Sequence, residues 1–290
     1  MKTVLVTGAN GFIGTALVKN LEQRGFNVIK YVSSMGSIVD FDFINEYYYI
    51  KIDHIFHLAS KTFIPDSWSN PMSFYKVAVI GTENILELCR KQNISMTFVS
   101  AYLYGEPKQL PISESDYPRP NNPYAHSKYL AEDLCKFYSN FYNVKVVIAR
   151  PFNIYGKGQN EEFLIPSIIR QALNTKVIKV RDLHPKRDYI YLDDLIDGLI
   201  KTLNTSNHLS VYNFGFGSSI SVENIINTVQ KIIKSNKRVE SAEMERKNEI
   251  MDVVADITKA QEELNWHPKI NLEDGIKLIL GESNEKHTNK

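Results

Sequence analysis

The sequence predicts an α/β protein with a doubly wound parallel sheet and a smaller α/β domain at its C-terminal end. Short β-branched runs alternate with longer amphipathic stretches along most of the chain, as a parallel sheet flanked by helices requires. A glycine-rich turn joins the first run to the first amphipathic stretch. From Gly217 onward the pattern changes, and this part reads as a smaller unit stacked on the sheet.

Apolar runs bounded by turn residues predict strands, and apolar residues at helical spacing predict helices. The predicted strands are Thr3–Thr7, Asn27–Val32, Ile55–Leu58, Met96–Ser100, Val144–Ala149 and Tyr212–Phe214. The predicted helices are Phe12–Arg24, Met72–Gln92, Asn122–Tyr142, Phe163–Leu173, Asp193–Leu203, about Val222 to Ser235, and a last short one. We expect residues 1–152 and about 187–216 in the first domain, and about 153–186 and 217–290 in the second.

The composition excludes several classes of partner. The 290 residues carry 34 Lys+Arg against 33 Asp+Glu, too even a balance for a basic nucleic-acid or membrane surface. No apolar run approaches the roughly 18 residues that cross a bilayer, and a strand from Met1 to Thr7 leaves no room for a signal peptide. Cys89 and Cys135 match no zinc spacing. We expect a cytoplasmic protein without a metal site, a nucleic-acid partner or a membrane partner.

The glycine-rich turn is typical of a phosphate site. Gly8 permits the tight turn, Gly11 lets the backbone approach a pyrophosphate, and Gly14 allows close packing of helix on strand. The helix beginning at Phe12 and Ile13 adds free N–H groups and the positive end of its dipole. Glycines that merely turn the chain are the alternative. Three at this spacing, at the first strand-to-helix junction, favour a bound dinucleotide.

This loop, together with Tyr124-Ala-His-Ser-Lys128, resembles the extended short-chain dehydrogenase/reductase family, which acts mainly on nucleotide-activated sugars. The resemblance implies a Rossmann-type fold and a nucleotide-sugar-binding second domain. It covers nearly the whole chain. Its further motifs are His57-Leu58-Ala59, Gly81-Thr82, Tyr104-Gly105, Arg-Pro-Phe-Asn-Ile-Tyr-Gly at 150–156, Arg187-Asp188-Tyr189 and Ala255-Asp256.

Tyr124 and Lys128 stand four residues apart, on one face of a helix. A free Tyr has a pKa of about 10, and a nearby Lys⁺ is expected to lower it by roughly 1–3 units. The pair could then move a proton to or from a sugar oxygen. The resemblance adds Ser100, which hydrogen-bonds the same oxygen. An isolated Tyr and Lys would favour a solvated pair, but the glycine loop and Ser100 favour catalysis.

Four other residues qualify this interpretation. Family members usually carry Asn where this chain has Ala78, so the support of the catalytic Lys is expected to be rebuilt. Family dehydratases carry an acid where this chain has Tyr102, which makes a dehydratase improbable. His57 ends an apolar strand and is expected to be a satisfied structural histidine. His126 points away from Tyr124, so we expect it at the surface or at a dimer interface.

The second strand ends at Ser33 and Ser34 without the carboxylate that NAD-specific folds usually present there. The two hydroxyls could donate to a 2′-phosphate, so NADP(H) is favoured and NAD(H) remains possible. The resemblance assigns the cofactor further contacts. These are Asp40 and Phe41 beside the adenine, Leu58, Ala59, Ser60 and Pro151, in addition to Tyr124 and Lys128.

The resemblance also assigns contacts to the nucleotide sugar. Two arginines from different segments suit a diphosphate, although two surface arginines are equally compatible with the sequence, and Arg181 and Lys179 are alternatives. The assigned residues are Thr62, Tyr102, Asn153, Leu164, Arg187 and Arg246.

We therefore predict an NAD(P)H-dependent reductase of a 4-keto-(6-deoxy) nucleotide hexose. An NAD-dependent nucleotide-sugar 4-epimerase is the alternative, because its core catalytic residues are the same. A catalytically silent dinucleotide-binding protein is a distant third, since Ser100, Tyr124 and Lys128 are all present. The resemblance also implies a homodimer, in which the helices near 72–92 and 122–142 pair into a four-helix bundle.

Overall fold

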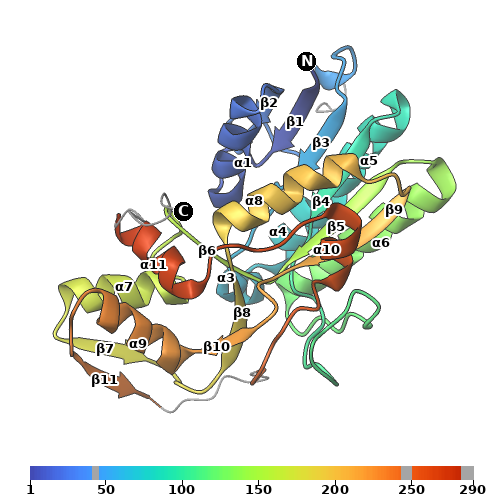
Figure 1. The fold of residues 1–290 in the computed structure, drawn as a ribbon. Coiled ribbons are helices and arrows are strands. Elements are labelled where there is room, and N and C mark those ends of the chain that lie inside the picture. The colour runs from blue at the N-terminus through green and yellow to red at the C-terminus, as the bar shows by residue number, and fades with distance from the viewer. Residues whose placement is uncertain (41–45, 243–249, 282–290) are drawn as a thin grey trace.

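The computed structural model describes residues 1–40, 46–242 and 250–281 (Figure 1). A six-stranded sheet in the order β2-β1-β3-β4-β5-β9 forms its centre, and every neighbouring pair is parallel. The predicted doubly wound parallel sheet is confirmed, with strand ends shifted by up to three residues. Its strands are β1 (Thr3–Thr7), β2 (Asn27–Tyr31), β3 (His54–His57), β4 (Ser95–Val99), β5 (Val146–Pro151) and β9 (Leu209–Phe214).

Helices cover both faces of this sheet. Because successive side chains of a strand point to opposite faces, Val4 and Val6 of β1 belong to one core and Leu5 to the other. The first core packs against α1 and α8, and the second against α5 and α6 (Figure 1). The bounds of these helices are α1 (Phe12–Gln23), α5 (Gly81–Gln92), α6 (Pro123–Tyr142) and α8 (Leu192–Lys201).

The single helix predicted over Met72–Gln92 is wrong in one respect, because the structure divides it into three pieces. These are α4 (Pro71–Tyr75), the π-helical segment η2 (Lys76–Ile80) and α5. In η2 the N–H of Gly81 donates to the carbonyl of Lys76, five residues back, which inserts one residue relative to an α-helix. Ala78 lies buried in this segment. The short helix α3 (Ile64–Ser69) precedes it and was not predicted.

A smaller group of elements packs beside the carboxyl ends of the large sheet (Figure 1). It has a three-stranded sheet in the order β10-β8-β6 and a two-stranded sheet of β11 and β7. The short strands β6, β7, β10 and β11 were not predicted, and the division of residues between two domains stays a prediction. The strands are β6 (Asn153–Tyr155), β7 (Val177–Val180), β8 (Lys186–Tyr191), β10 (Ser219–Ser221) and β11 (Arg238–Ser241); the helices are α7 (Leu164–Asn174), α9 (Val222–Ile232) and α11 (Leu272–Leu280). The helix α10 (Thr258–Leu264) packs instead on the core of the large sheet, through Ala260 and Leu264. Short 3₁₀ turns occur at η1 (Ser33–Met35) and η3 (Thr202–Asn204).

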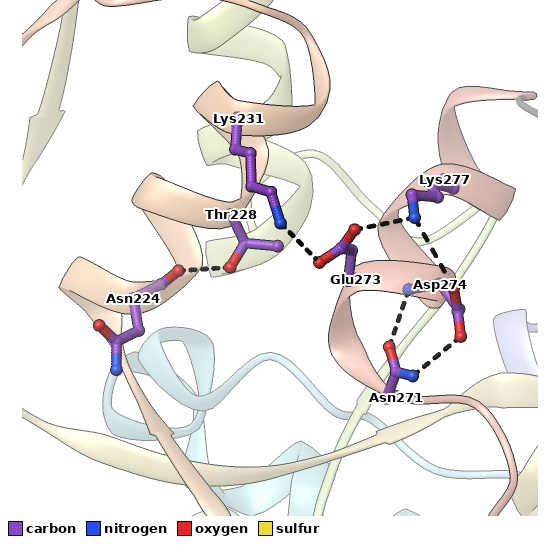
Figure 2. A network of polar contacts seen from close by, with 7 residues as sticks. All are labelled: Asn224, Thr228, Lys231, Asn271, Glu273, Asp274 and Lys277. Atoms are coloured by element: carbon purple, nitrogen blue, oxygen red, sulfur yellow. Dashed lines mark hydrogen bonds and ion pairs between the residues drawn. The ribbon is translucent and has the colours of Figure 1, made fainter.

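Polar contacts join α9 to α11 at the surface of this smaller group (Figure 2). Glu273 receives Lys231 Nζ at 3.2 Å and Lys277 Nζ at 2.8 Å, and Asn271 caps α11 by accepting the N–H of Asp274. Exposed ion pairs contribute only about 0–1 kcal/mol each. The apolar core beneath, which includes Ile226 and Ile276, therefore supplies most of the attachment.

Cys89 and Cys135 are both buried free thiols. Within the three described ranges, no helix combines the length and apolar character that a membrane span needs.

Candidate active site

A cleft of about 1870 Å³ lies along the carboxyl ends of the large sheet and reaches the smaller group of elements. Its walls include Gly8 and Gly11 from the glycine loop, Tyr124 from α6, and Asn153 and Arg187 from the smaller group. Ligands of open α/β sheets bind at this edge. The cleft thus brings together residues that lie far apart in the sequence, from Gly8 to Val253.

The glycine loop has the geometry that a diphosphate requires. Gly8 has a φ of +69°, and a Cβ there would lie 2.9 Å from the backbone N of Ala59. A Cβ on Gly14 would lie 2.1 Å from the carbonyl oxygen of Gly8. The helix α1 begins after Gly11 without a side-chain cap or an acid in its first turn, so its first N–H groups can bind an anion. Phe12 and Ile13 also line the cleft.

Gly14→Ala is expected to destabilise the fold by about 3 kcal/mol, because the new methyl group overlaps a backbone carbonyl that cannot move away. Gly25→Ala is the matched control. It has open space around it and suffers only the left-handed backbone penalty, about 1–2 kcal/mol. Urea unfolding of both variants measures the difference. Equal or smaller loss for Gly14→Ala would contradict the close packing of loop and helix.

The adenosine end of the cleft agrees only in part with the prediction. Ser33 lines it, whereas Ser34 is exposed outside and Asp40 is not part of the wall. The backbone turns into η1 at Ser33, which separates the two hydroxyls. Phe41 lies outside the described residues. No Asp or Glu lines this end within the described chain.

The three predicted catalytic residues meet at the end of β4. Ser100 follows that strand, and its buried Oγ has no hydrogen-bond partner among the described residues. Asn122 caps α6 by accepting the N–H of Ala125 at 2.9 Å, which fixes Tyr124 in the first turn. Lys128 lies one turn further, and its Nζ donates to the carbonyl of Val99 at 2.8 Å.

The expected lowering of the Tyr124 pKa is wrong in this structure. Desolvation in the cleft raises the pKa of Tyr124 to about 12, while burial lowers the pKa of Lys128 to about 8. The i, i+4 spacing placed the two groups on one face, but the ammonium turns toward the carbonyl of Val99. The phenol is therefore protonated at neutral pH and can donate a proton.

The buried Lys128 predicts a pH dependence of stability. Its pKa is about 8 in the folded protein and 10.5 ordinarily, so the folded state releases the proton first and its stability rises as pH increases between these values. Between these pH values, the free energy of unfolding of the wild type is expected to rise by roughly 3 kcal/mol relative to that of Lys128→Met, which has no charge to titrate. Urea unfolding from pH 7 to 10.5 tests it, and a constant difference between the two proteins would contradict the assignment.

Tyr102 is held as a fixed wall of the cleft. Its ring packs 5.3 Å from that of Phe152 and 5.7 Å from that of Tyr104, centroid to centroid, and its hydroxyl donates to the carbonyl of Gly105. Burial raises its pKa further above the usual value. A protonated hydroxyl that already donates to the backbone cannot perform the acid and base steps of a dehydratase.

The residues assigned to the nucleotide sugar are distributed along the cleft. Thr62, Asn153, Leu164 and Arg187 all line it, as do the cofactor residues Leu58, Ala59, Ser60 and Pro151. Arg187 is also anchored, since its Nη1 donates to the carbonyls of Lys186 and Ile250. Arg246 lies outside the described residues, and the alternatives Lys179 and Arg181 line the cleft too.

Sequence reasoning missed two features of this cleft. Phe63 and Phe163, from opposite sides, bring their rings to 6.4 Å between centroids in an edge-to-face contact. Gln159 places a buried Oε1 without a described partner in the wall. Phe163 directly precedes Leu164, which the resemblance assigns to the nucleotide sugar, but a ring contact and an unsatisfied acceptor depend on the folded geometry.

The comparisons with known proteins agree with this geometry. The sequence profile of the NAD dependent epimerase/dehydratase family matches residues 4–215. The chain belongs to this family. It is 27% identical to the GDP-6-deoxy-D-mannose reductase of Pseudomonas aeruginosa, over 96% of each chain.

Two solved structures share the fold over 97% of this chain and 98% of their own, each at 26% identity with a TM-score of 0.89. One is RMD from Pseudomonas aeruginosa complexed with NADPH. The other is the UDP-glucose 4-epimerase of Thermotoga maritima with UDP-glucose. The fold class is thereby confirmed, and the chain is a nucleotide-sugar enzyme of the extended short-chain dehydrogenase/reductase group.

Proposed function

We propose that this protein reduces the 4-keto group of a nucleotide-activated hexose, preferably a 6-deoxy one, with NADPH. The observation that carries the proposal is that one cleft holds a protonated Tyr124 and the hydroxyl of Ser100, which has no partner among the residues the structure describes. Two oxygen donors at one point suit a carbonyl oxygen that gains negative charge as it is reduced.

Each residue then has a definite task. NADPH, when bound, supplies the hydride. Ser100 Oγ donates a hydrogen bond to the substrate carbonyl oxygen, and Tyr124 donates its proton to that oxygen. Lys128 places a positive charge beneath the site, where it compensates the phenolate that remains. Asn153 and Arg187 lie further along the cleft, where the diphosphate would extend.

Two features favour a reductase over an epimerase. The adenosine end lacks a carboxylate among the described residues, and its lining includes the hydroxyl-bearing Ser33 and Ser37, which suits a 2′-phosphate. Lys30, near the end of β2, has its Nζ paired with Glu22 at 2.8 Å. A reductase must also exchange its cofactor every turnover, whereas an epimerase retains it. The 4-epimerase remains the second candidate, since a UDP-glucose 4-epimerase shares the fold.

The test is to purify the protein, identify any bound dinucleotide, and follow NADPH absorbance with 4-keto-6-deoxy sugars carried on CDP, dTDP, GDP or UDP. Consumption of NADPH with one carrier is the expected result, and a lower rate with NADH is expected from the adenosine end. Tightly bound NAD⁺ with interconversion of UDP-glucose and UDP-galactose, and no net NADPH consumption, would establish the epimerase instead. If neither reduction nor epimerisation is observed, the remaining candidate is the catalytically silent dinucleotide-binding protein.

We further propose a homodimer that pairs α5 and α6 of two copies, and a cytoplasmic location; both stay predictions. An exposed aromatic group on α6 supports the dimer: Phe141 is 72% exposed, and Phe137 and Tyr142 are 48% exposed.

Phe141→Glu is expected to shift the mass in solution from dimer to monomer, because it buries a charge at the interface. Light scattering after gel filtration measures this. Tyr49→Glu, at a 91% exposed tyrosine elsewhere, is the control, and a Phe141→Glu protein of unchanged mass would exclude this interface.

A further inference from the structure

His57 and Thr82 each belong to a motif, but the proposed reaction gives neither side chain a task. Both are buried, at 1% and 0% exposure, although a buried polar side chain needs a specific reason. His57 is the last residue of β3 and directly precedes Leu58 and Ala59, which line the cofactor end of the cleft. Its place in the fold therefore relates it to cofactor binding.

The hydrogen bonds around His57 fix where its proton lies. Thr7 Oγ1 accepts the backbone N–H groups of Leu58 and Ala59, both at 3.2 Å, which occupies both lone pairs of the hydroxyl oxygen. The hydroxyl proton of Thr7 must then go to His57 Nδ1, 2.8 Å away. Since Nδ1 accepts, the ring proton is on Nε2, which donates to Thr82 Oγ1 at 3.0 Å. If His57 were an imidazolium, its Nδ1–H would be a third donor to Thr7 Oγ1, and the hydroxyl proton of Thr7 would have no acceptor.

This chain of bonds holds two loops together at the cofactor end. The N–H groups of Leu58 and Ala59 begin the loop that follows β3, and Gly8 begins the loop that follows β1. The loops are so close that a Cβ on Gly8 would lie 2.9 Å from the N of Ala59. The backbone carbonyl of Thr7 also accepts the Leu58 N–H, at 3.3 Å. An oriented hydroxyl on Thr7 adds the side-chain link that reaches Ala59 and keeps the Leu58–Ala59 turn against the glycine loop.

The surroundings of His57 keep it neutral. Its ring lies 5.6 Å from that of Phe98, and Lys128 Nζ lies 4.7 Å from the same Phe98 ring. Burial, together with the charge of Lys128, lowers the pKa of His57 to about 3. The ring thus stays an acceptor at Nδ1 throughout the neutral range.

We propose that His57 is a positioning residue for the dinucleotide: as the neutral Nε2–H tautomer bridging Thr82 and Thr7, it orients the Thr7 hydroxyl that fastens the Leu58–Ala59 turn to the glycine loop. The proposal rests on the dinucleotide binding contained in the proposed function. It does not depend on whether the enzyme is a reductase or an epimerase. It explains why a histidine and a threonine 25 residues apart occur at these two motif positions.

The tautomer is tested directly on the wild-type protein. The ring ¹⁵N NMR signals of His57 are assigned in ¹⁵N-histidine-labelled protein as those that disappear in His57→Gln. These signals are expected to show a protonated, pyrrole-type Nε2 and an unprotonated, pyridine-type Nδ1. The pattern should not change between about pH 6 and pH 8, because a folded-state pKa near 3 lies far below that range. A protonated Nδ1, or an imidazolium in this range, would overturn the proposal.

The positioning role is tested by comparing Thr7→Val, which keeps the shape but lacks the hydroxyl, with Thr7→Ser, which restores it. Dissociation constants for NADPH and NADH are measured by nucleotide fluorescence and, separately, the binding of UDP and GDP by calorimetry. Thr7→Val is expected to weaken dinucleotide binding about tenfold, with Thr7→Ser recovering most of it and nucleoside diphosphate binding changed less than about twofold.

A purely structural hydroxyl would lower the unfolding temperature of Thr7→Val but leave the dissociation constant of the folded protein unchanged, and that result would contradict the proposal. Equal weakening of nucleoside diphosphate binding would contradict it as well. Failure of the proposed reaction is seen separately, as wild-type protein that binds the dinucleotide but consumes no NADPH. A wild type that binds no dinucleotide would overturn both proposals.

Discussion

Replacing Tyr124 by Phe is expected to lower kcat for ketone reduction by about 10²–10⁴-fold, the usual contribution of a positioned acid. The pKa of Tyr124 is raised to about 12, so the hydroxyl carries its proton at neutral pH and its removal leaves no donor of that proton. The ring of Phe74 packs edge-to-face against Tyr124, at 6.4 Å between centroids. Since Phe keeps this contact, the fold and NADPH binding should persist.

Tyr129→Phe is the matched control, because it makes the same change on the same helix at a hydroxyl whose partner is Tyr117, 3.4 Å away. Stopped-flow mixing with NADPH and a 4-keto-6-deoxy nucleotide sugar separates binding from the chemical step. More than half of wild-type activity in Tyr124→Phe would exclude the tyrosine as the acid. An equal loss in Tyr129→Phe would show that the helix, rather than the proton donor, had been disturbed.

The large sheet could be predicted because its strands are short apolar runs next to strong turn signals. The same local reasoning put Ser100 at the end of a predicted strand, where ligands of parallel sheets bind, and Ser100 lines the cleft there. Its catalytic role came from the family resemblance and stays a prediction. Local reasoning could not find β7 or β11: these are four-residue strands whose pairing joins Val177 to Arg238, across 61 positions. Nor could helical periodicity detect η2, because a single inserted residue leaves the apolar pattern on both sides intact.

In the candidate site, sequence reasoning located the candidate catalytic residues but did not predict their pKa values. The i, i+4 spacing put Tyr124 and Lys128 on one face of α6, and we therefore expected the lysine to lower the pKa of the phenol. The structure reverses that direction because burial in the cleft desolvates the phenol and raises its pKa, while the ammonium of Lys128 is bonded to the carbonyl of Val99. Direction and burial of a side chain are tertiary properties, so the pair could be located from the sequence while its electrostatics could not.

A second consequence of tertiary packing is a buried ion pair that supports the catalytic helix. Glu132 of α6 receives Arg150 Nε at 2.9 Å and Nη2 at 2.6 Å, with the two side chains 0% and 2% exposed. Arg150 Nη1 donates to the hydroxyl of Tyr104, which donates in turn to Asn213. The network thus joins α6 to β5 and β9, one turn beyond Lys128.

Glu132→Gln is expected to lower the free energy of unfolding by about 3–5 kcal/mol, because it leaves the guanidinium of Arg150 buried without a counter-charge. Urea is the suitable denaturant, since guanidinium chloride would screen the charge. The double variant Glu132→Leu with Arg150→Met removes both charges and should regain most of the loss, as replacement of a buried pair by apolar groups is often neutral. If the double variant is as unstable as Glu132→Gln, the deficit comes from the Tyr104 and Asn213 hydrogen bonds rather than from an unpaired charge. Loss of activity in Glu132→Gln at a temperature where it is still folded would show that the pair also holds Lys128 and Tyr124 in register with β4.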